Sequence, residues 1–395
     1  MQLKHIIYQE NKGLPSHWRL EGVTLGGISL VVGKNSSGKT RLLNLIDNIA
    51  KMVSGRLLVT SGEWKASFER RKGQAIEHQE YSLNVAAGTR LVVEESFEIN
   101  RQRIMHRQDS GAGFVLKKSS KSRVQYKVPQ DQLMAVVRRD EIQHPYFDHL
   151  HRWGSGLCYY RFGSEMGKNS FTALTPNEPQ QNGNLPLAGL VDNAAHVYRK
   201  TFDRFKDVYK GMILDDLQTL GYPCSDVVLA FTQGLIFNGI PPLQLGVMEN
   251  DRTAPTYQGD MSQGMYRAFA VCVQVNANIL WEKSLRVGRE LALGDAPMVV
   301  IDDIGEGLDY SRSRALVRCL IEKARENNIQ LVMSSNDRFI MNDVPLENWI
   351  ILHREGSEVR AFDYQNSKEL FEEFQYLGLN NFDFFSNELF LRGSK

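Results

Sequence analysis

Residues Gly33 to Thr40 read GKNSSGKT and fit the spacing GxxxxGK[ST], which constrains the fold more than any other feature of the chain. The apolar run 28–32 precedes this segment, and residues 41–53 follow it with apolar side chains at helical spacing. The sequence therefore predicts a strand, a loop and a helix in succession. Backbone N–H groups of such a loop and the positive end of the helix surround phosphate oxygens, so we expect a nucleotide-phosphate site.

Within this loop each residue type has a chemical reason to be present. Lys39 supplies a positive charge for the β and γ phosphates, and the Thr40 hydroxyl is placed to ligate Mg²⁺. We therefore expect ATP and Mg²⁺ as cofactors, with a chance glycine-rich turn as the alternative. The residues expected to bind the nucleotide here are Gly33, Lys34, Asn35, Ser36, Ser37, Gly38, Lys39, Thr40 and Arg41.

A second chemical feature is the apolar run Met298–Ile301, which is followed by two carboxylates. A buried parallel strand has this composition, and ligands of open α/β sheets bind at the carboxyl ends of such strands. We expect Asp302 to be a Mg²⁺ carboxylate and Asp303 to orient or deprotonate the attacking water. Glu306 is an alternative base, and an acidic turn without function is the alternative for the whole segment.

The remaining periodicities indicate three successive segments. Residues 64–127 alternate apolar with polar side chains, which predicts antiparallel hairpins. Residues 131–222 are mainly helical, except for an exposed loop expected at Thr172–Leu185. We predict an α/β fold with an N-terminal ATPase lobe and β-lobe at 1–130, a helical insertion at 131–225 and a C-terminal ATPase lobe at 226–395.

Composition limits the partners and the compartment. The formal net charge is +1, so no overall field favours nucleic acid or a membrane. No apolar stretch reaches the length of a membrane-spanning helix, and the N-terminus has no signal-peptide pattern, so we expect a cytoplasmic protein. The cysteines have no CxxC spacing and are expected to be buried thiols: Cys158, Cys224, Cys272 and Cys319.

Three further segments follow in an order that resembles ABC-type ATPases. Met261–Met265 precedes an apolar helix and resembles the signature loop, Gly307–Asp309 resembles the D-loop, and Ser334–Asp337 lies where that family places its switch histidine. The resemblance implies a homodimer or higher homo-oligomer in which two copies share each ATP. It also implies that Ser262, Gln263 and Gly264 contact the partner's nucleotide and that Asn336 acts at the γ-phosphate.

Within that family the chain resembles the SMC, RecF and OLD branch, because a long insertion separates Lys39 from Ser262. Residues 91–107 look like the β-lobe of OLD-like ATPases, many of which serve in antiphage defence with a nuclease partner, as in PARIS and Septu. No stretch resembles a TOPRIM nuclease domain. The resemblance implies a switch subunit that acts with a separate nuclease or toxin. A RecF-like repair factor and an ATP-gated scaffold with little hydrolysis are the alternatives.

Two departures from the family pattern predict slow hydrolysis. Asp303 stands where a glutamate is usual, and Asn336 stands where a histidine is usual. The shorter carboxylate reaches less far toward a water, and the amide brings no positive charge. The signature loop also has Gln263 where glycine is common.

Three weaker features each have a structural alternative. The basic residues between Arg101 and Arg123 indicate a nucleic-acid surface or a solvated hairpin. The histidines of segment 144–151 favour a polar helix face over a metal site. The aromatic tail Phe371–Phe385 favours core packing, with a docking surface as the alternative.

Overall fold

The computed structural model describes residues 1–170, 192–232, 234, 236, 241–288, 297–375 and 377–391. The chain forms two compact units. The first comprises Met1–Leu157, Leu291–Met298 and Asn328–Lys395, and the second comprises Cys158–Glu290 and Val299–Asn327. The loop expected at Thr172–Leu185 lies outside the described residues. The division into segments 1–130, 131–225 and 226–395 stays a prediction. The boundaries of the two compact units do not coincide with the boundaries of these segments.

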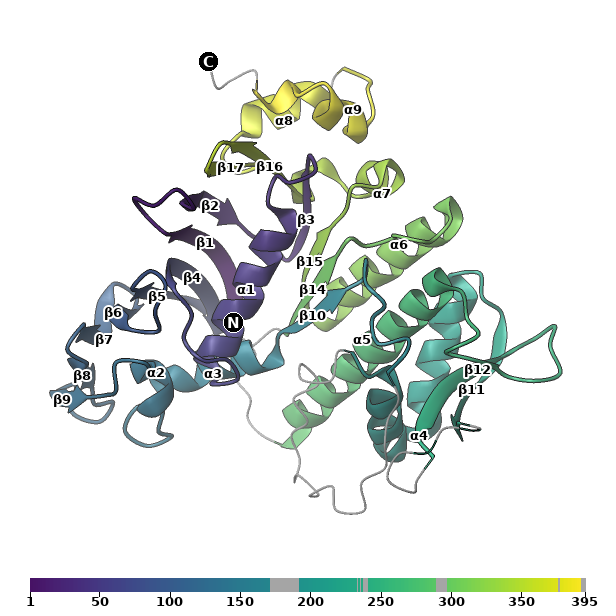
Figure 1. Ribbon diagram of the computed structural model, residues 1–395, viewed down its shortest axis with the longest axis horizontal. Helices are drawn as coiled ribbons and strands as arrows, with labels where there is room; N and C mark the ends of the chain where they lie inside the picture. The colour runs from purple at the N-terminus through teal and green to yellow at the C-terminus, as the bar shows by residue number, and fades with distance from the viewer. Residues whose placement is uncertain are drawn as a thin grey trace. The chain divides into compact units, whose positions relative to one another are not determined.

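The centre of the first unit is the strand β3 (Ile28–Gly33), which is buried along its whole length. It pairs in parallel with β15 (Gln330–Ser334) on one side and with β16 (Trp349–Glu355) on the other. The helix α1 (Lys39–Val53) follows β3 directly and packs against it (Figure 1). The predicted strand, loop and helix are therefore present.

The same sheet continues through strands from both ends of the chain. The order is β16, β17 (Glu358–Asp363), β2 (Trp18–Thr24), β1 (Gln2–Glu10) and then β4. The pair β16–β17 is antiparallel and β17–β2 is parallel. Trp18, on β2, is buried beneath the start of α1, so the N-terminal segment supports the phosphate loop from below.

The β-lobe extends this sheet as a series of antiparallel neighbours, as the alternation predicted. Its strands are β4 (Gly62–Lys72), β5 (Ala75–Val85), β6 (Val92–Ile99), β7 (Gln102–Gln108), β8 (Ala112–Leu116) and β9 (Arg123–Lys127). Two helices follow, α2 (Met134–Val137) and α3 (Tyr146–Gly156). The ring of Trp153 on α3 packs edge-on against Phe68 of β4, with ring centroids 4.8 Å apart, which fixes α3 on one face of the lobe.

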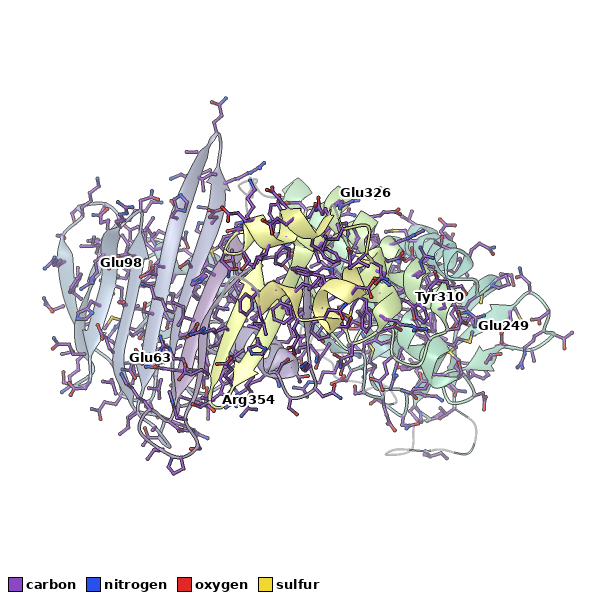
Figure 2. All side chains as sticks on the ribbon, turned by 90° about the horizontal axis from the view of Figure 1, so that it is seen from above. Glu63, Glu98, Glu249, Tyr310, Glu326 and Arg354 are labelled. Carbon is purple, nitrogen blue, oxygen red and sulfur yellow. The ribbon has the colours of Figure 1, made fainter. Side chains whose placement is uncertain are left out.

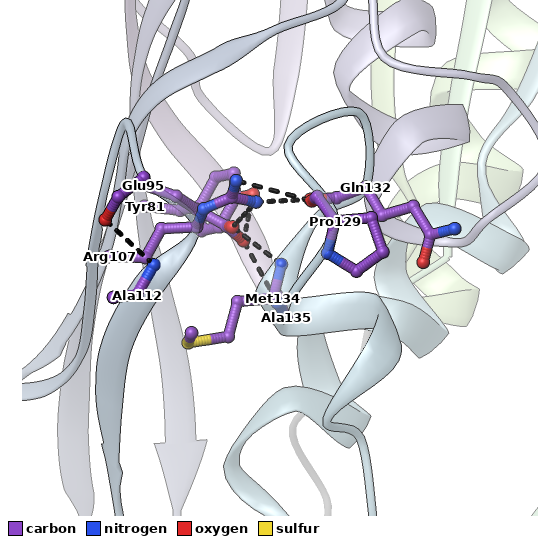
Figure 3. Close-up of polar contacts among 9 residues, drawn as sticks. Tyr81, Glu95, Arg107, Ala112, Pro129, Gln132, Met134 and Ala135 are labelled. Carbon is purple, nitrogen blue, oxygen red and sulfur yellow. Dashed lines mark hydrogen bonds and ion pairs between the residues drawn. The ribbon is translucent and has the colours of Figure 1, made fainter. Parts of the chain in front are cut away.

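A buried polar network joins the lobe strands to the start of α2 (Figure 3). Glu95 is completely buried and accepts hydrogen bonds from the Tyr81 hydroxyl at 2.9 Å and from the backbone N–H groups of Met134 at 2.7 Å and Ala135 at 3.0 Å. Arg107, also completely buried, lies 3.9 Å from Glu95 and donates to the Gln132 carbonyl. Burial raises the pKa of Glu95, against the pull of these donors and of Arg107.

The second unit contains a parallel pair of strands, β10 (Cys158–Arg161) and β14 (Met298–Asp302). Strand β10 corrects the expectation of helix throughout 131–222: its four residues are too few to show a period, and burial beside β14 selects the extended form. The helices α4 (Ala194–Thr219) and α5 (Gln263–Gly288) lie side by side (Figure 1). The helix α6 (Tyr310–Asn327) also belongs to this unit.

The strands β11 (Cys224–Phe231) and β12 (Leu243–Glu249) form a small antiparallel sheet with β13 (Thr256–Tyr257). The inserted helical subdomain is therefore accompanied by β-strands. The fold as a whole is mixed α/β with an extended sheet, as predicted.

The C-terminal segment belongs to the first unit and consists of short elements. They are α7 (Arg338–Asp343), η2 (Leu346–Asn348), α8 (Lys368–Gln375), α9 (Asn381–Ser386) and η3 (Leu389–Leu391). Phe371, Phe374 and Phe384 of the aromatic tail are buried and Phe384 packs against the other two and against Phe390, so this part of the tail is core, as favoured above. None of the described helices is long and apolar enough to cross a membrane.

Candidate nucleotide site

The phosphate loop connects β3 to α1, and its two glycines stand where a side chain would not fit. A Cβ atom at Gly33 would lie 2.3 Å from the Ser37 hydroxyl and 2.8 Å from the Leu352 carbonyl. Gly38 has φ 106° and packs against Trp18. This conformation is rarely adopted by residues with a side chain, so the GxxxxGK spacing is required by the backbone geometry.

Two side chains of the loop indicate that it suits an anion. The Lys39 ammonium is buried and donates to the Gly33 carbonyl at 2.8 Å and the Lys34 carbonyl at 3.4 Å, which holds the charge over the loop. The Ser37 hydroxyl is buried and has no hydrogen-bond partner within the described part of the chain. Buried polar groups are normally paired, so Ser37 has unused capacity inside a cationic loop. Thr40 is exposed at the first turn of α1.

Neighbouring parallel strands place further side chains at the phosphate loop. Asn336, just after β15, donates to the Asn35 side chain at 3.2 Å, and Arg354, near the end of β16, donates to the Ser36 carbonyl at 3.3 Å. Arg354 is labelled in Figure 2. Lys34 forms an ion pair with Glu388, and this contact lowers the pKa of Glu388. The structure thus brings Asn336 to the loop and adds Arg354, which the sequence did not indicate.

Arg41 has a supporting geometry at the base of the loop. Its guanidinium lies 4.1 Å above the Trp18 ring and forms an ion pair with Glu10. Partial burial lowers the pKa of Arg41. Because the side chain is engaged by Trp18 and Glu10, both from the first two strands, Arg41 fastens the N-terminal segment to α1.

In the second unit the carboxyl end of β14 carries Asp302, which is buried. The Tyr159 hydroxyl, on the parallel neighbour β10, donates to Asp302 Oδ2 at 3.3 Å. Burial and the Asp302 charge raise the pKa of Tyr159, so the phenol stays protonated and remains a donor. Tyr159 thus fixes one Asp302 oxygen, which is consistent with a carboxylate oriented to bind a cation.

The next residue, Asp303, has φ 54°, so its side chain leaves the strand in a different direction from that of Asp302. A Cβ atom at Gly163 would lie 3.2 Å from Asp303 Oδ2 and 2.6 Å from Glu306 Oε2. Both candidate bases therefore face the loop that follows β10, and only a glycine leaves room for them there. The geometry keeps both Asp303 and Glu306 as candidates.

The segment that resembles the signature loop begins α5. The Ser262 hydroxyl accepts from the Met265 N–H at 3.2 Å, which caps the helix, and Ser262 is exposed. Gly264 is buried, and a Cβ atom there would lie 2.2 Å from the Gly307 carbonyl. This close approach joins the signature-like segment to the D-loop-like segment within one chain.

Arg267 is a positioning residue that the sequence analysis missed. Its guanidinium donates to the carbonyls of Ser164 at 2.7 Å, Glu306 at 2.9 Å and Gly163 at 3.0 Å. Gln263 also donates to the Ser164 carbonyl, at 3.3 Å. These bonds tie α5 to the carboxylate loop and to the loop after β10. A lone arginine within the otherwise apolar run of α5 was the signal available in the sequence.

Other candidate centres do not form. No group of three or more His, Cys, Asp or Glu side chains that would hold a metal occurs in the described ranges. His144 is engaged by Tyr126 at 2.8 Å and by the Leu116 carbonyl. Cys158, Cys272 and Cys319 are buried, Cys224 is half-buried, and none of the four forms a disulfide.

Comparison with known proteins identifies the family. The model of the family described as "AAA domain, putative AbiEii toxin, Type IV TA system" matches residues 28–342, which is most of the chain. The chain belongs to this family. The match includes both the phosphate loop and the acidic strand end. No curated protein matches the sequence.

The fold is that of the SMC head ATPases. An SMC head crystallised with the C-terminal winged-helix domain of ScpA is 11% identical, with a TM-score of 0.51 over 93% of this chain and 100% of that chain. An SMC head with an extended coiled coil, bound to the C-terminal domain of ScpA from Pyrococcus furiosus, is 11% identical over 94% and 99%, with a TM-score of 0.47. The SMC head domain from Thermotoga maritima is 10% identical over 92% and 99%, with a TM-score of 0.43.

The Gly264 contact predicts a local packing defect in one variant and none in another. Gly264→Ala places a methyl group against the Gly307 carbonyl and should cost about 1–3 kcal/mol of stability. The control is Gly259→Ala, where no atom lies within 4 Å, and it should stay within about 0.5 kcal/mol of the parent. Urea unfolding measures both. Equal stability of the two variants would show that Gly264 and Gly307 are not in contact.

Proposed function

We propose that this protein is an ATP-dependent switch subunit that binds ATP with Mg²⁺ and hydrolyses it slowly. The observation that carries the proposal is the phosphate loop, whose glycines, buried lysine and unused Ser37 hydroxyl fit nucleotide phosphates. The family match covers this loop and the acidic strand end together. In this proposal the backbone N–H groups of residues 33–40 hold the phosphates, and Lys39 turns from the loop carbonyls to the β and γ oxygens.

The roles proposed for the remaining residues follow from the sequence motifs that contain them. Thr40 and Asp302 would hold Mg²⁺, which stabilises charge on the γ-phosphate, and Tyr159 keeps Asp302 oriented. Asp303, or Glu306 in its place, accepts a proton from the attacking water. Asn336 donates one hydrogen bond to the γ-phosphate from its present place against Asn35.

We further propose that two copies of the chain complete each site. Ser262 is exposed at the start of α5, where it can meet the phosphates of a partner's nucleotide. Arg267 and the Gly264–Gly307 contact link this segment to the loop that carries Asp303 and Glu306 in its own chain. Loss of the γ-phosphate from the nucleotide of one copy would thereby alter the loop that carries Asp303 and Glu306 in the other copy.

The cellular role that we propose is regulation of a separate toxin or nuclease in a defence complex. The family description names an AbiEii toxin and a toxin–antitoxin system, which favours this setting over DNA repair. A cytoplasmic location follows from that role. A RecF-like repair factor and a scaffold that scarcely hydrolyses remain the competing functions, and measured turnover separates the scaffold from the switch.

Nucleotide binding is tested by one lysine variant and a matched control. Lys39→Ala removes the buried ammonium of the loop and should weaken ATP binding at least tenfold, which corresponds to about 1.4 kcal/mol. Lys51→Ala lies at the far end of the same helix, paired with Asp47, and should bind ATP as the parent does. Calorimetry measures both affinities. Unchanged affinity in Lys39→Ala would contradict the assignment of the phosphate loop.

The identity of the base is tested by single-turnover hydrolysis in four proteins: the parent, Asp303→Glu, Asp303→Asn and Glu306→Gln. We expect slow turnover in the parent, because a misplaced base forfeits part of the roughly 10²–10⁴-fold that a well-placed one supplies. Asp303→Asn should abolish hydrolysis and Asp303→Glu should preserve or raise it. Fast parental turnover, or loss only in Glu306→Gln, would show that Asp303 is not the base.

A further inference from the structure

The β-lobe of the first unit contains a pocket away from the phosphate loop, here called the lobe pocket. Its volume is about 380 Å³. Its lining comes from the β4–β5 hairpin, the β6–β7 hairpin, the end of β8 with the connection to β9, and the start of α3. Its floor is apolar and includes Ile99, Ile104 and Leu116. A rim assembled from distant segments is a property of the fold.

The rim of the lobe pocket carries an excess of positive charge. Lys72, Lys118 and Lys121 are exposed and form no ion pair within the described part of the chain. Arg70 is buried and lies 3.8 Å from Glu77, which is the one carboxylate of the lining. The remaining three ammonium groups converge on the same pocket without a counter-charge. Like charges gathered at one pocket raise the local positive potential, which attracts an anion.

The backbone holds two of these lysines in place. The Lys118 N–H donates to the Gln143 carbonyl at 3.1 Å, and the Lys121 N–H donates to the Lys117 carbonyl at 2.8 Å. The β8–β9 connection is therefore anchored both to itself and to the segment before α3. Tyr146 and His149, from the first turn of α3, add two rings beside the lysines.

The basic residues between Arg101 and Arg123 do not all lie on one surface. Arg107 is completely buried beside Glu95, and Arg103 forms an ion pair with Glu98 at 3.0 Å. Of the cations in that stretch, only Lys118 and Lys121 line the lobe pocket. The other cations of the lining, Arg70 and Lys72, come from β4. The basic surface is thus built across the fold and not along the sequence.

A second groove on the lobe has the opposite character. Its lining contains Glu63, Glu80, Glu94 and Glu98, with Arg19, Lys65 and Arg103 as the cations. Glu63 and Arg70 lie on opposite faces of β4, because their positions differ by an odd number of residues. Figure 2 shows Glu63 and Glu98 on the lobe strands. Of these two hollows of the lobe, only the lobe pocket has an excess of cations.

We propose that the lobe pocket binds the phosphate backbone of a nucleic-acid strand. Lysine ammonium groups neutralise phosphates as point charges, and no free guanidinium fork is present in the lining to prefer carboxylates. The apolar floor and the ring of Tyr146 suit a sugar or base edge next to the phosphates. This site is separate from the ATP site of the proposed function and does not rest on it.

The test uses the full chain in the Lys39→Ala background, so that the phosphate loop contributes little to anion binding. The pocket variant is Lys72→Glu with Lys118→Glu and Lys121→Glu. The matched control is Arg71→Glu with Arg90→Glu and Lys127→Glu, three exposed cations of the same lobe outside the pocket lining. Fluorescence anisotropy with labelled single-stranded and duplex DNA and RNA measures affinity from 50 to 200 mM salt. Melting curves check that all variants fold.

The pocket variant should bind nucleic acid at least tenfold more weakly. The slope of log K against log salt concentration should become shallower by roughly 2–3, since each phosphate contact contributes about 0.7–0.9 to it. The control should lose less than threefold. Equal losses in pocket variant and control, or no nucleic-acid binding by the unmutated background, would overturn the proposal. Binding of free AMP or pyrophosphate in the pocket without binding of any nucleic acid would assign it to a small phosphorylated ligand and also overturn it.

Discussion

The parallel pairing of β3 with β15 and β16 is the constraint on which the nucleotide loop depends. Parallel neighbours present their carboxyl ends at one edge, so this pairing gathers Gly33, Asn336 and Arg354 from widely separated parts of the sequence. The Leu352 carbonyl approaches Gly33 so closely that no side chain fits. The loop conformation is therefore enforced by tertiary structure as well as by its own glycines.

The second unit repeats this arrangement on a smaller scale. The parallel pair β10–β14 places Tyr159 against Asp302 and turns the following loop toward Asp303 and Glu306. Arg267 of α5 then donates hydrogen bonds to three backbone carbonyls of these loops. The carboxylates and the signature-like segment are consequently joined by direct contacts within one unit.

The sequence predicted those parts of the site whose chemistry is local. GKNSSGKT fixes its own turn and helix start, and four apolar residues before Asp302 need only burial to form a strand. The β-lobe hairpins were also predictable, because alternation survives in isolated strands. The sequence pattern that predicts each of these elements is local and lies within the element itself.

The rest depends on neighbours that are distant in sequence. Strand β10 exists because β14 lies beside it, and Tyr159 and Gly163 acquire their roles from that pairing. Arginine is usually found at the surface, but Arg107 is buried, because Glu95 and a backbone carbonyl provide partners for its guanidinium. Arg354 reaches the phosphate loop only through the register of β16. The apolar periodicity of a single segment cannot predict contacts between segments that are distant in sequence.

The most direct test of the account is to mix two inactive chains. Ser262→Arg leaves the phosphate loop intact and alters an exposed residue, which avoids the packing defect expected at Gly264. Lys39→Ala leaves the signature-like segment intact. If two copies share each ATP, a mixed dimer contains one complete site, and the mixture should regain hydrolysis that neither chain shows alone. A mixture that stays inactive, although pull-down shows that mixed dimers form, would contradict the shared site.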